Sequence, residues 1–370
     1  MRDDEGYAMK TTQKGRGAAD NPDNRYARWQ REEADDGWGN DGEEFAPHLF
    51  TELIIDTARS VISYNHSPDI PFDRSINPYR GCEHGCSYCF ARPSHAYLDL
   101  SPGLDFETKL AYKPDAVEVL RRELAHPKYV CKPIALGINT DGWQPVERRL
   151  RLTRGILETL AACRHPVSIV TKSALILRDL DILAEMANQH LVRVAVSITT
   201  LNADLARRME PRAASSQRRL SVLEELSAAG IPTAVLVAPL IPALTDHELE
   251  DILQAAANAG ARTAGYVLLR LPHEVKPLFR DWLEREEPGR AEHVFSLLRQ
   301  MHGGKEYDSR FGHRHRGDGP LAEMIQQRFK IAIRRLGLNQ SLPAFDCTVF
   351  QPPSMGTPNV KADAAQQSLF

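Results

Sequence analysis

Apolar residues from Pro133 onward alternate between short runs rich in β-branched side chains and longer amphipathic stretches. Short β-branched runs are typical of buried strands, and a period near 3.6 residues is typical of helices that cover a sheet. The pattern predicts strands over residues 134–139, 167–171, 192–199, 233–238 and 263–269. It predicts helices over residues 147–163, 177–189, 202–229 and 246–259. Such alternation indicates an α/β fold with a parallel sheet and right-handed crossovers.

A sixth strand is expected over residues 73–80, ahead of the others. Six parallel strands are enough for an open or partial barrel and too few for a closed eight-stranded one. The sequence therefore predicts a partial (β/α)6 barrel.

The rest of the chain of 370 residues differs in composition from this alternating region. Residues 1–45 are polar and predict a disordered leader, and residues 346–370 predict a disordered tail. Residues 46–272 form the expected core. Residues 273–345 are expected to form a helical C-terminal extension, with helices near 275–299 and 321–336.

The composition, 42% hydrophobic and 26% charged, is that of an ordinary globular protein, which excludes collagen-like and fully disordered chains. Lys and Arg number 46 against 49 Asp and Glu, so no global positive field attracts nucleic acid or anionic lipid. A nucleic-acid contact would need a local patch, and the densest basic segment is residues 312–317. No long apolar run and no signal peptide are evident, so we expect no membrane association and a cytoplasmic location.

Three of the six cysteines, Cys82, Cys86 and Cys89, lie in a CxxxCxxC pattern within a loop that contains Gly81 and Gly85. In a reducing compartment, three thiols this close indicate a metal site rather than disulfides. One possibility is zinc, for which His84 or His95 would be the fourth ligand, at a spacing unusual for zinc sites. The other is a [4Fe–4S] cluster in which the fourth iron keeps an open position.

The pattern, with Tyr88 before the third cysteine, resembles the cysteine motif of the radical S-adenosylmethionine (SAM) superfamily. In that superfamily the motif follows the first strand of a partial six-stranded barrel. The resemblance implies that the fourth iron chelates the amino and carboxylate groups of SAM. It also implies that one-electron reduction cleaves SAM to methionine and a 5′-deoxyadenosyl radical, which abstracts hydrogen from a substrate.

Polar residues follow several predicted strands, and ligands of parallel sheets bind at these carboxyl ends. Together with Tyr88, the candidate SAM contacts are Asn139, Thr140, Asp141, Lys172, Ser197, Thr199 and Pro239. Helix capping is the alternative role for each hydroxyl, amide or carboxylate among them.

The segment Met209-Glu210-Pro211-Arg212 interrupts a predicted helix, because proline removes a backbone hydrogen bond. Residues 77–212 resemble the superfamily branch related to spore photoproduct lyase, in which an acidic-Pro-Arg segment faces SAM. The resemblance implies that Glu210 and Arg212 contact its ribose or carboxylate; a surface kink is the alternative. The chain departs from this branch where a hydrogen-donating cysteine is expected, since Ile138 and Asn139 occupy that stretch.

The sequence thus predicts a radical SAM enzyme with a [4Fe–4S] cluster, SAM as cosubstrate and an electron donor such as flavodoxin or ferredoxin. Its substrate is unidentified, and a nucleic acid is the first candidate. The alternatives are a small molecule or protein substrate, or a non-catalytic zinc or iron–sulfur protein. No catalytic residue is assigned. Arg207, Arg208, Arg218 and Arg219 are expected on a solvated helix face.

Overall fold

The computed structural model describes residues 15–26 and 50–354. Its main sheet has the strand order β10-β9-β8-β7-β6-β3-β2. The strands are β2 (Ile62–Tyr64), β3 (Arg74–Ile76), β6 (Ile134–Leu136), β7 (Val167–Thr171), β8 (Val192–Ser197), β9 (Thr233–Leu240) and β10 (Thr263–Leu268). Every neighbouring pair is parallel except β2 and β3. The predicted α/β fold is confirmed.

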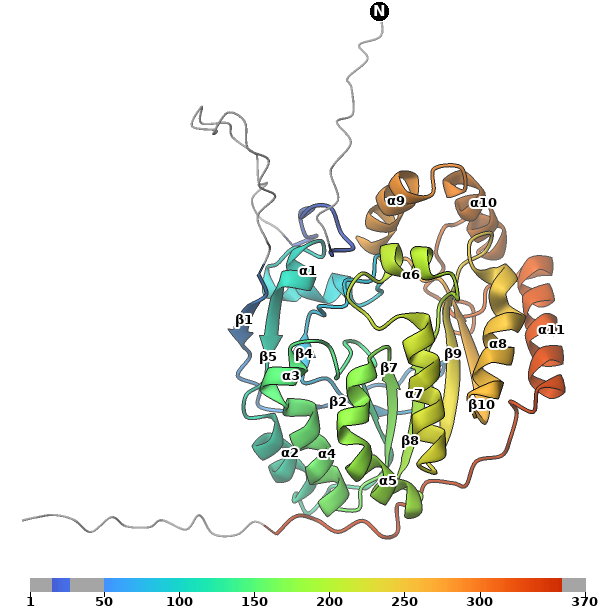
Figure 1. Ribbon diagram of the computed structural model, residues 1–370. Helices are drawn as coiled ribbons and strands as arrows, with labels where there is room; N and C mark the ends of the chain where they lie inside the picture. The colour runs from blue at the N-terminus through green and yellow to red at the C-terminus, as the bar shows by residue number, and fades with distance from the viewer. Residues whose placement is uncertain (1–14, 27–49, 355–370) are drawn as a thin grey trace, which may run out of the picture.

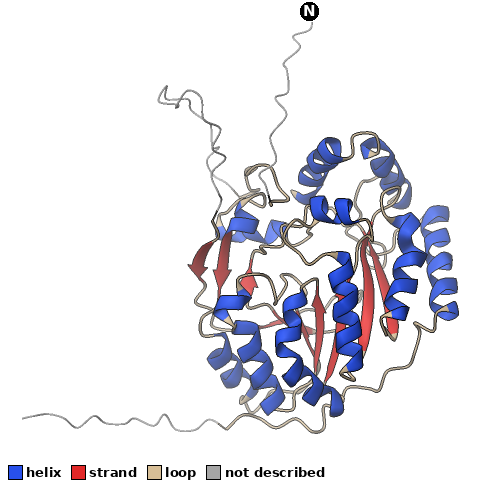
Figure 2. Ribbon diagram, in the orientation of Figure 1, coloured by secondary structure: helices blue, strands red, loops and turns tan. Residues whose placement is uncertain are grey.

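Helices surround this sheet (Figure 2). They are α2 (Ala116–Leu124), α3 (Glu147–Leu150), α4 (Leu152–Ala162), α5 (Leu180–Asn188), α6 (Ala203–Met209), α7 (Ser216–Ala228) and α8 (Leu249–Asn258). Short 3₁₀ turns are η2 (Ala174–Asp179) and η3 (Asp246–Glu248). In α5 the buried side chains Ile182, Leu183, Met186 and Ala187 follow the helical period and join the core cluster that covers the strands.

The register of β7 and β8 illustrates why these segments are strands. Val167 pairs with Val192 and Thr171 with Val196, and alternate residues of each strand are fully buried. The residues between them are mostly half-buried, so one face of these strands is fully covered and the other is partly enclosed.

The strand expected over residues 73–80 is instead two strands in two sheets. β3 belongs to the main sheet, whereas β4 (Tyr79–Arg80) belongs to a small sheet of order β1-β5-β4. The other strands of the small sheet are β1 (Glu52–Ile55) and β5 (Lys109–Tyr112). Pro78 separates β3 from β4 because it has no N–H for a sheet ladder. The cysteine loop therefore directly follows β4 of the small sheet and not a strand of the main sheet.

Three predicted helices are divided, and the first is the helix expected over 147–163, which breaks into α3 and α4 at Arg151. The helix expected over 202–229 breaks into α6 and α7 at Glu210-Pro211, and that over 275–299 into α9 (Val275–Glu286) and α10 (Ala291–Met301). The last helix of the described residues is α11 (Gly319–Arg335), close to the predicted range. Two short elements follow the cysteine loop, η1 (Arg92–Leu98) and α1 (Asp105–Thr108).

Both predicted disordered ends are only partly within the described residues. Residues 15–26, here called the N-terminal segment, differ from the expectation because they pack against the cysteine-loop region: Ala18 joins Leu104 and Leu278 in an apolar cluster. Arg25 forms an ion pair with Glu274 at 2.9 Å. The rest of the leader, 1–14 and 27–45, and residues 355–370 of the tail lie outside the described residues.

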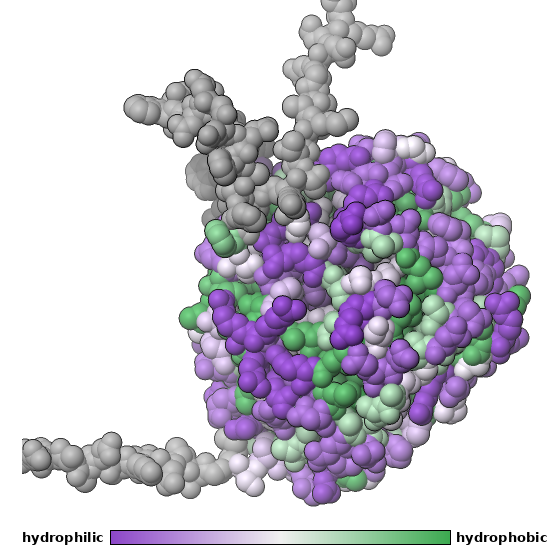
Figure 3. Space-filling view, viewed as in Figure 1, coloured by the Kyte–Doolittle hydropathy of each residue, from purple (hydrophilic) through white to green (hydrophobic). Residues whose placement is uncertain are grey.

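Within the described ranges, none of the helices is long and apolar enough to cross a bilayer. The face drawn in Figure 3 is mostly hydrophilic, with hydrophobic residues in separate patches. Scattered apolar side chains are normal on a protein surface and need no special explanation.

Candidate active site at the cysteine loop

The loop from Gly81 to Cys89 places three free thiols together, Cys82 and Cys86 buried and Cys89 half-buried. Gly81 has a φ of 84°, and a Cβ there would lie 2.9 Å from the carbonyl oxygen of Phe106. The left-handed conformation and the close approach both require glycine. The Cys82 N–H donates to the same Phe106 oxygen at 2.9 Å, which fixes the first cysteine against α1.

Burial raises the pKa of the Cys82 thiol, and the charges of Asp141 and the other two cysteines raise it further. Burial and the Glu210 carboxylate raise the pKa of Cys86 to about 12. These thiols are therefore protonated at neutral pH unless a cationic centre binds them, and binding would release their protons.

Among the described residues, no three His, Cys, Asp or Glu side chains converge so as to hold a single metal ion. The two histidines weighed as zinc ligands have other partners: His84 Nδ1 lies 3.6 Å from Asp141, and His95 Nε2 bonds the Lys109 carbonyl at 2.9 Å. The donor set fits a [4Fe–4S] cluster better, because each of its thiolates binds a different iron and the three sulfurs need not meet at one point.

A buried ion pair between Arg92 and Glu107 supports the cysteine loop. Arg92 and Glu107 are both fully buried, and Arg92 donates to the Glu107 carboxylate. The same guanidinium donates from Nε and Nη2 to the Cys86 carbonyl oxygen at 3.0 and 2.9 Å. Nη1 reaches the carbonyl oxygens of Pro102 and Gly103. Arg92 thus ties the second cysteine to η1 and α1.

The N-terminal segment completes the partners of Glu107. The backbone N–H groups of Gly17 and Ala18 donate to its carboxylate at 3.0 and 2.9 Å. A Cβ on Gly17 would lie 1.7 Å from the carbonyl oxygen of Gly85, inside the cysteine loop. Backbone therefore packs directly on backbone here, and only glycine fits.

Gly17→Ala is expected to detach the N-terminal segment from the loop, because neither backbone can yield by the distance that a Cβ needs. Trypsin should then release a fragment that begins at residue 17 at least about tenfold faster than from wild type, since local opening controls such cleavage. Gly289→Ala is the matched control, because a Cβ there meets nothing within 4 Å. Equal cleavage rates for the two variants would contradict this packing.

A buried network joins the cysteine loop to the carboxyl end of β8. The Tyr88 hydroxyl lies 3.2 Å from Thr199 Oγ1 and donates to Glu210. Thr199 also donates to Glu210 at 2.9 Å. Arg219 donates to the other Glu210 oxygen and to the Ser197 carbonyl at 3.1 Å. The expectation that Arg219 is solvated is wrong: it is 1% exposed, because its partner is buried at the α6–α7 break.

Glu210 is the electrostatic centre of this network. Burial alone would raise its pKa, but the charges of Arg219 and Lys172, with hydrogen bonds from Arg219 and Tyr88, lower the pKa to about 2. Glu210 is therefore a carboxylate at neutral pH. The Lys172 ammonium, half-buried, lies 5.8 Å from the centre of the Tyr88 ring. The predicted residues Tyr88, Lys172, Thr199 and Glu210 do meet beside Cys86.

The Asp141 carboxylate is already hydrogen-bonded within the protein and is not a free ligand-binding group. Its carboxylate accepts from Thr171 Oγ1 at 2.9 Å, from the Lys172 N–H at 2.7 Å and from the Trp143 N–H at 2.9 Å. It also faces His84 of the cysteine loop. Asp141 therefore links the ends of β6 and β7 to the loop.

The remaining predicted contacts are spread around the same edge. Thr140 donates to the Tyr79 carbonyl at 2.9 Å, and the Asn139 side chain is exposed. Arg212 donates to Glu83 of the cysteine loop at 3.2 Å, so the kink is attached to the loop rather than free. Ser197 and Pro239 are buried at the ends of β8 and β9.

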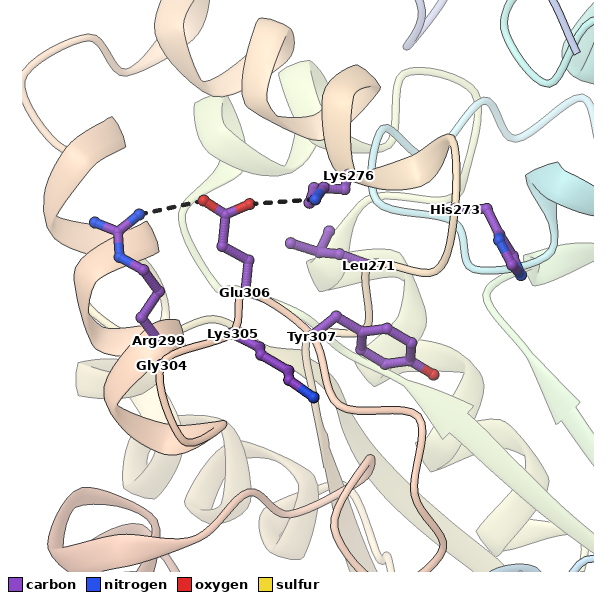
Figure 4. Close-up of a pocket in the computed structure, with 8 residues that line it drawn as sticks. All are labelled: Leu271, His273, Lys276, Arg299, Gly304, Lys305, Glu306 and Tyr307. Atoms are coloured by element: carbon purple, nitrogen blue, oxygen red, sulfur yellow. Dashed lines mark hydrogen bonds and ion pairs between the residues drawn. The ribbon is translucent and has the colours of Figure 1, made fainter. Parts of the chain in front are cut away.

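A cavity of about 470 Å³ lies at the end of β10 (Figure 4). In it Glu306 forms ion pairs with Arg299 at 3.2 Å and Lys276 at 3.8 Å. Two other lining residues, Leu271 and Tyr307, pack in the same apolar cluster as Cys86 and Tyr88. The cavity therefore borders the apolar cluster that also contains Cys86 and Tyr88.

Sequence reasoning missed Arg92, Glu107, Gly17 and Arg270. The Arg270 guanidinium follows β10 and stacks 4.7 Å from the centre of the Phe90 ring, next to Cys89. Within residues 15–26 and 50–354 it has no acidic partner, and its Nε is buried without a hydrogen bond. In the sequence, the one indication that Arg92 and Phe90 belong to the site is that they follow Cys89 closely.

Comparisons with known proteins show the family and the fold that the chain shares with them. The family model described as the radical SAM superfamily matches residues 76–256. An uncharacterized protein of Mycobacterium tuberculosis is 41% identical over 259 residues, which cover 70% of this chain and 76% of the relative. An uncharacterized protein of Methanocaldococcus jannaschii is 29% identical over 197 residues, covering 53% and 71% of the two chains.

Solved structures of spore photoproduct lyase have a similar fold. One variant superposes with a TM-score of 0.55 at 15% identity, covering 77% of this chain and 80% of that chain. A second variant, with bound AdoMet and dinucleoside spore photoproduct, gives a TM-score of 0.55 at 17% identity, covering 77% and 79%. At such identity the likeness shows a shared fold.

Proposed function

Because the chain belongs to the radical SAM superfamily, we propose that it is an enzyme that cleaves SAM reductively and abstracts hydrogen from an organic substrate. The observation that carries the proposal is the set of three free thiols, two buried and one half-buried, beside the Tyr88–Thr199–Glu210–Arg219 network. In this proposal Cys82, Cys86 and Cys89 hold a [4Fe–4S] cluster. When bound, the cluster supplies the electron that cleaves SAM to methionine and a 5′-deoxyadenosyl radical.

The chain's own residues would bind and orient SAM at the carboxyl edge of the sheet. We assign this role to the residues Tyr88, Asn139, Thr140, Asp141, Lys172, Ser197, Thr199, Glu210, Arg212 and Pro239. Lys172 is a cation suited to the carboxylate of SAM, and hydroxyls such as Thr199 suit its ribose. Asp141 and Glu210 would act mainly by holding other groups, because their oxygens already accept several hydrogen bonds.

We also propose how the chain is divided into a core and an extension. The main sheet and its helices would be the partial (β/α)6 barrel, within residues 46–272. Helices α9, α10 and α11 would form a C-terminal extension, within residues 273–345. Closing the site on several sides would keep water away from a radical intermediate.

An external electron donor, such as flavodoxin or ferredoxin, is part of the proposal.

For the substrate, the basic segment 312–317 is the relevant observation. Arg314 donates to Asp69 at 2.7 Å and to Ser67 at 2.6 Å, and His313 pairs with Asp318. Ion pairing leaves fewer charges for phosphate groups, which favours a small-molecule or protein substrate over nucleic acid. Binding to an oligonucleotide that weakens steeply with salt and is lost in Arg316→Ala would reverse this preference.

Anaerobic reconstitution with iron and sulfide tests the proposed cofactor. Wild type is expected to bind about four irons per chain, as a [4Fe–4S] cluster requires, and to give an electron paramagnetic resonance signal after reduction that changes on addition of SAM. Cys163→Ser is the matched control, because Cys163 lies outside the loop, and it should behave as wild type. Stoichiometric zinc without iron would contradict the proposal and favour a non-catalytic metal protein.

A further inference from the structure

The C-terminal segment, residues 339–354, crosses the edge of the main sheet at which the parallel strands begin. Asn339 pairs with Thr263 at the start of β10, and the Gln340 N–H donates to the Arg262 carbonyl at 3.3 Å. Figure 1 shows this segment running from α11 below the strands and past α5 toward α4. It therefore runs across the sheet on the side opposite the cysteine loop.

Contacts along the segment fix its path. The Arg193 guanidinium, at the start of β8, lies 4.3 Å from the centre of the Phe345 ring. The Phe350 ring lies 5.7 Å from that of Tyr129 and 5.3 Å from that of His165, centre to centre. The Gln351 N–H donates to the Cys163 carbonyl at 2.9 Å. The segment thus passes β10 and β8 and ends beside the starts of β6 and β7.

Two free cysteines meet on this path, one from each of two distant parts of the chain. Cys131 stands three residues before β6 and two after Tyr129, and Cys347 stands three residues before Phe350. Both are half-buried. Cys347 is close enough to Cys131 to influence its ionisation: burial and the neighbouring Cys347 together raise the pKa of Cys131 to about 12. Nothing in the proposed reaction uses either thiol.

We propose that Cys131 and Cys347 form a reversible disulfide that fastens the C-terminal segment across the amino edge of the sheet. The site would accept a low-molecular-weight disulfide as oxidant. It lies on the opposite edge from Cys82, Cys86 and Cys89, so its oxidation is chemically separate from the proposed cluster.

The exchange balances in two steps. The Cys347 thiolate attacks one sulfur of the oxidant, forms a mixed disulfide and releases one thiolate. The Cys131 thiol then loses its proton to solvent and attacks the mixed disulfide at the Cys347 sulfur, which releases the second thiolate. The two cysteines are oxidised by two electrons and the oxidant is reduced to two thiols.

The disulfide would close a loop that contains every strand from β6 to β10. Cross-links that close long loops remove the most freedom from the unfolded chain. Oxidation is therefore expected to raise Tm by at least about 5 °C.

The test uses the full chain with its iron loaded, incubated anaerobically in mixtures of reduced and oxidised glutathione. Intact mass should fall by two hydrogen atoms, peptide mapping without reductant should give a Cys131–Cys347 linked peptide, and Tm should rise. Cys347→Ser should lose the linkage and the rise in Tm while keeping the reduced wild-type Tm and iron content. Cys163→Ser should retain all three oxidative changes.

Two results would overturn the proposal. One is a glutathione adduct on Cys347 with no linkage to Cys131 at any redox ratio. The other is a linked peptide that involves a different cysteine. Neither depends on SAM cleavage, so failure here is distinguishable from failure of the proposed enzyme function.

Discussion

Arg92→Met is expected to lower the free energy of unfolding by about 3–5 kcal/mol, because it leaves the fully buried Glu107 carboxylate without its countercharge. The substitution also removes both hydrogen bonds to the Cys86 carbonyl. The cysteine loop should therefore hold less iron after reconstitution, even where the variant is folded. Urea unfolding of the metal-free chain and iron analysis measure the two effects separately.

Glu225→Gln is the matched control, since it breaks the half-exposed ion pair between Arg218 and Glu225. Exposed pairs contribute little, so this variant should stay within about 0.5 kcal/mol of wild type and bind iron normally. If Arg92→Met unfolds at the wild-type urea concentration and binds as much iron, the ion pair does not hold the loop.

Arg219→Met is expected to have a comparable effect, about 3–5 kcal/mol at neutral pH, because Glu210 is completely enclosed. In wild type the folded pKa of Glu210, about 2, lies below its unfolded value, so its stabilisation is present above pH 4.5 and lost as pH falls toward 2. Without Arg219, burial should raise the folded pKa. The stability difference between the variant and wild type should then shrink as pH falls from 7 toward 4.5.

Urea unfolding of the metal-free chain at several pH values between 7 and 4.5 measures this difference. Arg219→Lys keeps a positive charge and should recover part of the stability and most of the wild-type pH dependence. A difference that does not change with pH would mean that lost packing, not the carboxylate, accounts for the effect of Arg219→Met.

The strands of the core could be predicted because they are short runs rich in β-branched residues, and β7 occupies the predicted residues 167–171. The small sheet could not, because β4 has two residues and β1 is largely exposed, so neither has a period that sequence reasoning can detect. Breaks inside helices were foreseen only at Pro211, where the chemistry of proline marks them.

The candidate site, like the fold, could be predicted only where its residues are close in sequence. Cysteine spacing and the Tyr88 and Glu210 motifs are local in sequence, and the structure brings these residues together. The prediction for Arg219 was wrong because charged residues on a helix face are usually exposed to solvent. Its partner Glu210 lies on the other side of the break between α6 and α7. Arg92, Glu107 and Gly17 act as one unit only in three dimensions, since 90 residues separate Gly17 from Glu107.

The most direct test of the account is the formation of 5′-deoxyadenosine. The reconstituted chain is mixed with dithionite and SAM without oxygen, and the products are separated by chromatography for wild type, Cys86→Ala and Cys163→Ser. The account predicts 5′-deoxyadenosine from wild type and Cys163→Ser and none above background from Cys86→Ala. An iron-loaded wild type that yields no 5′-deoxyadenosine, or an equal yield from Cys86→Ala, would contradict it.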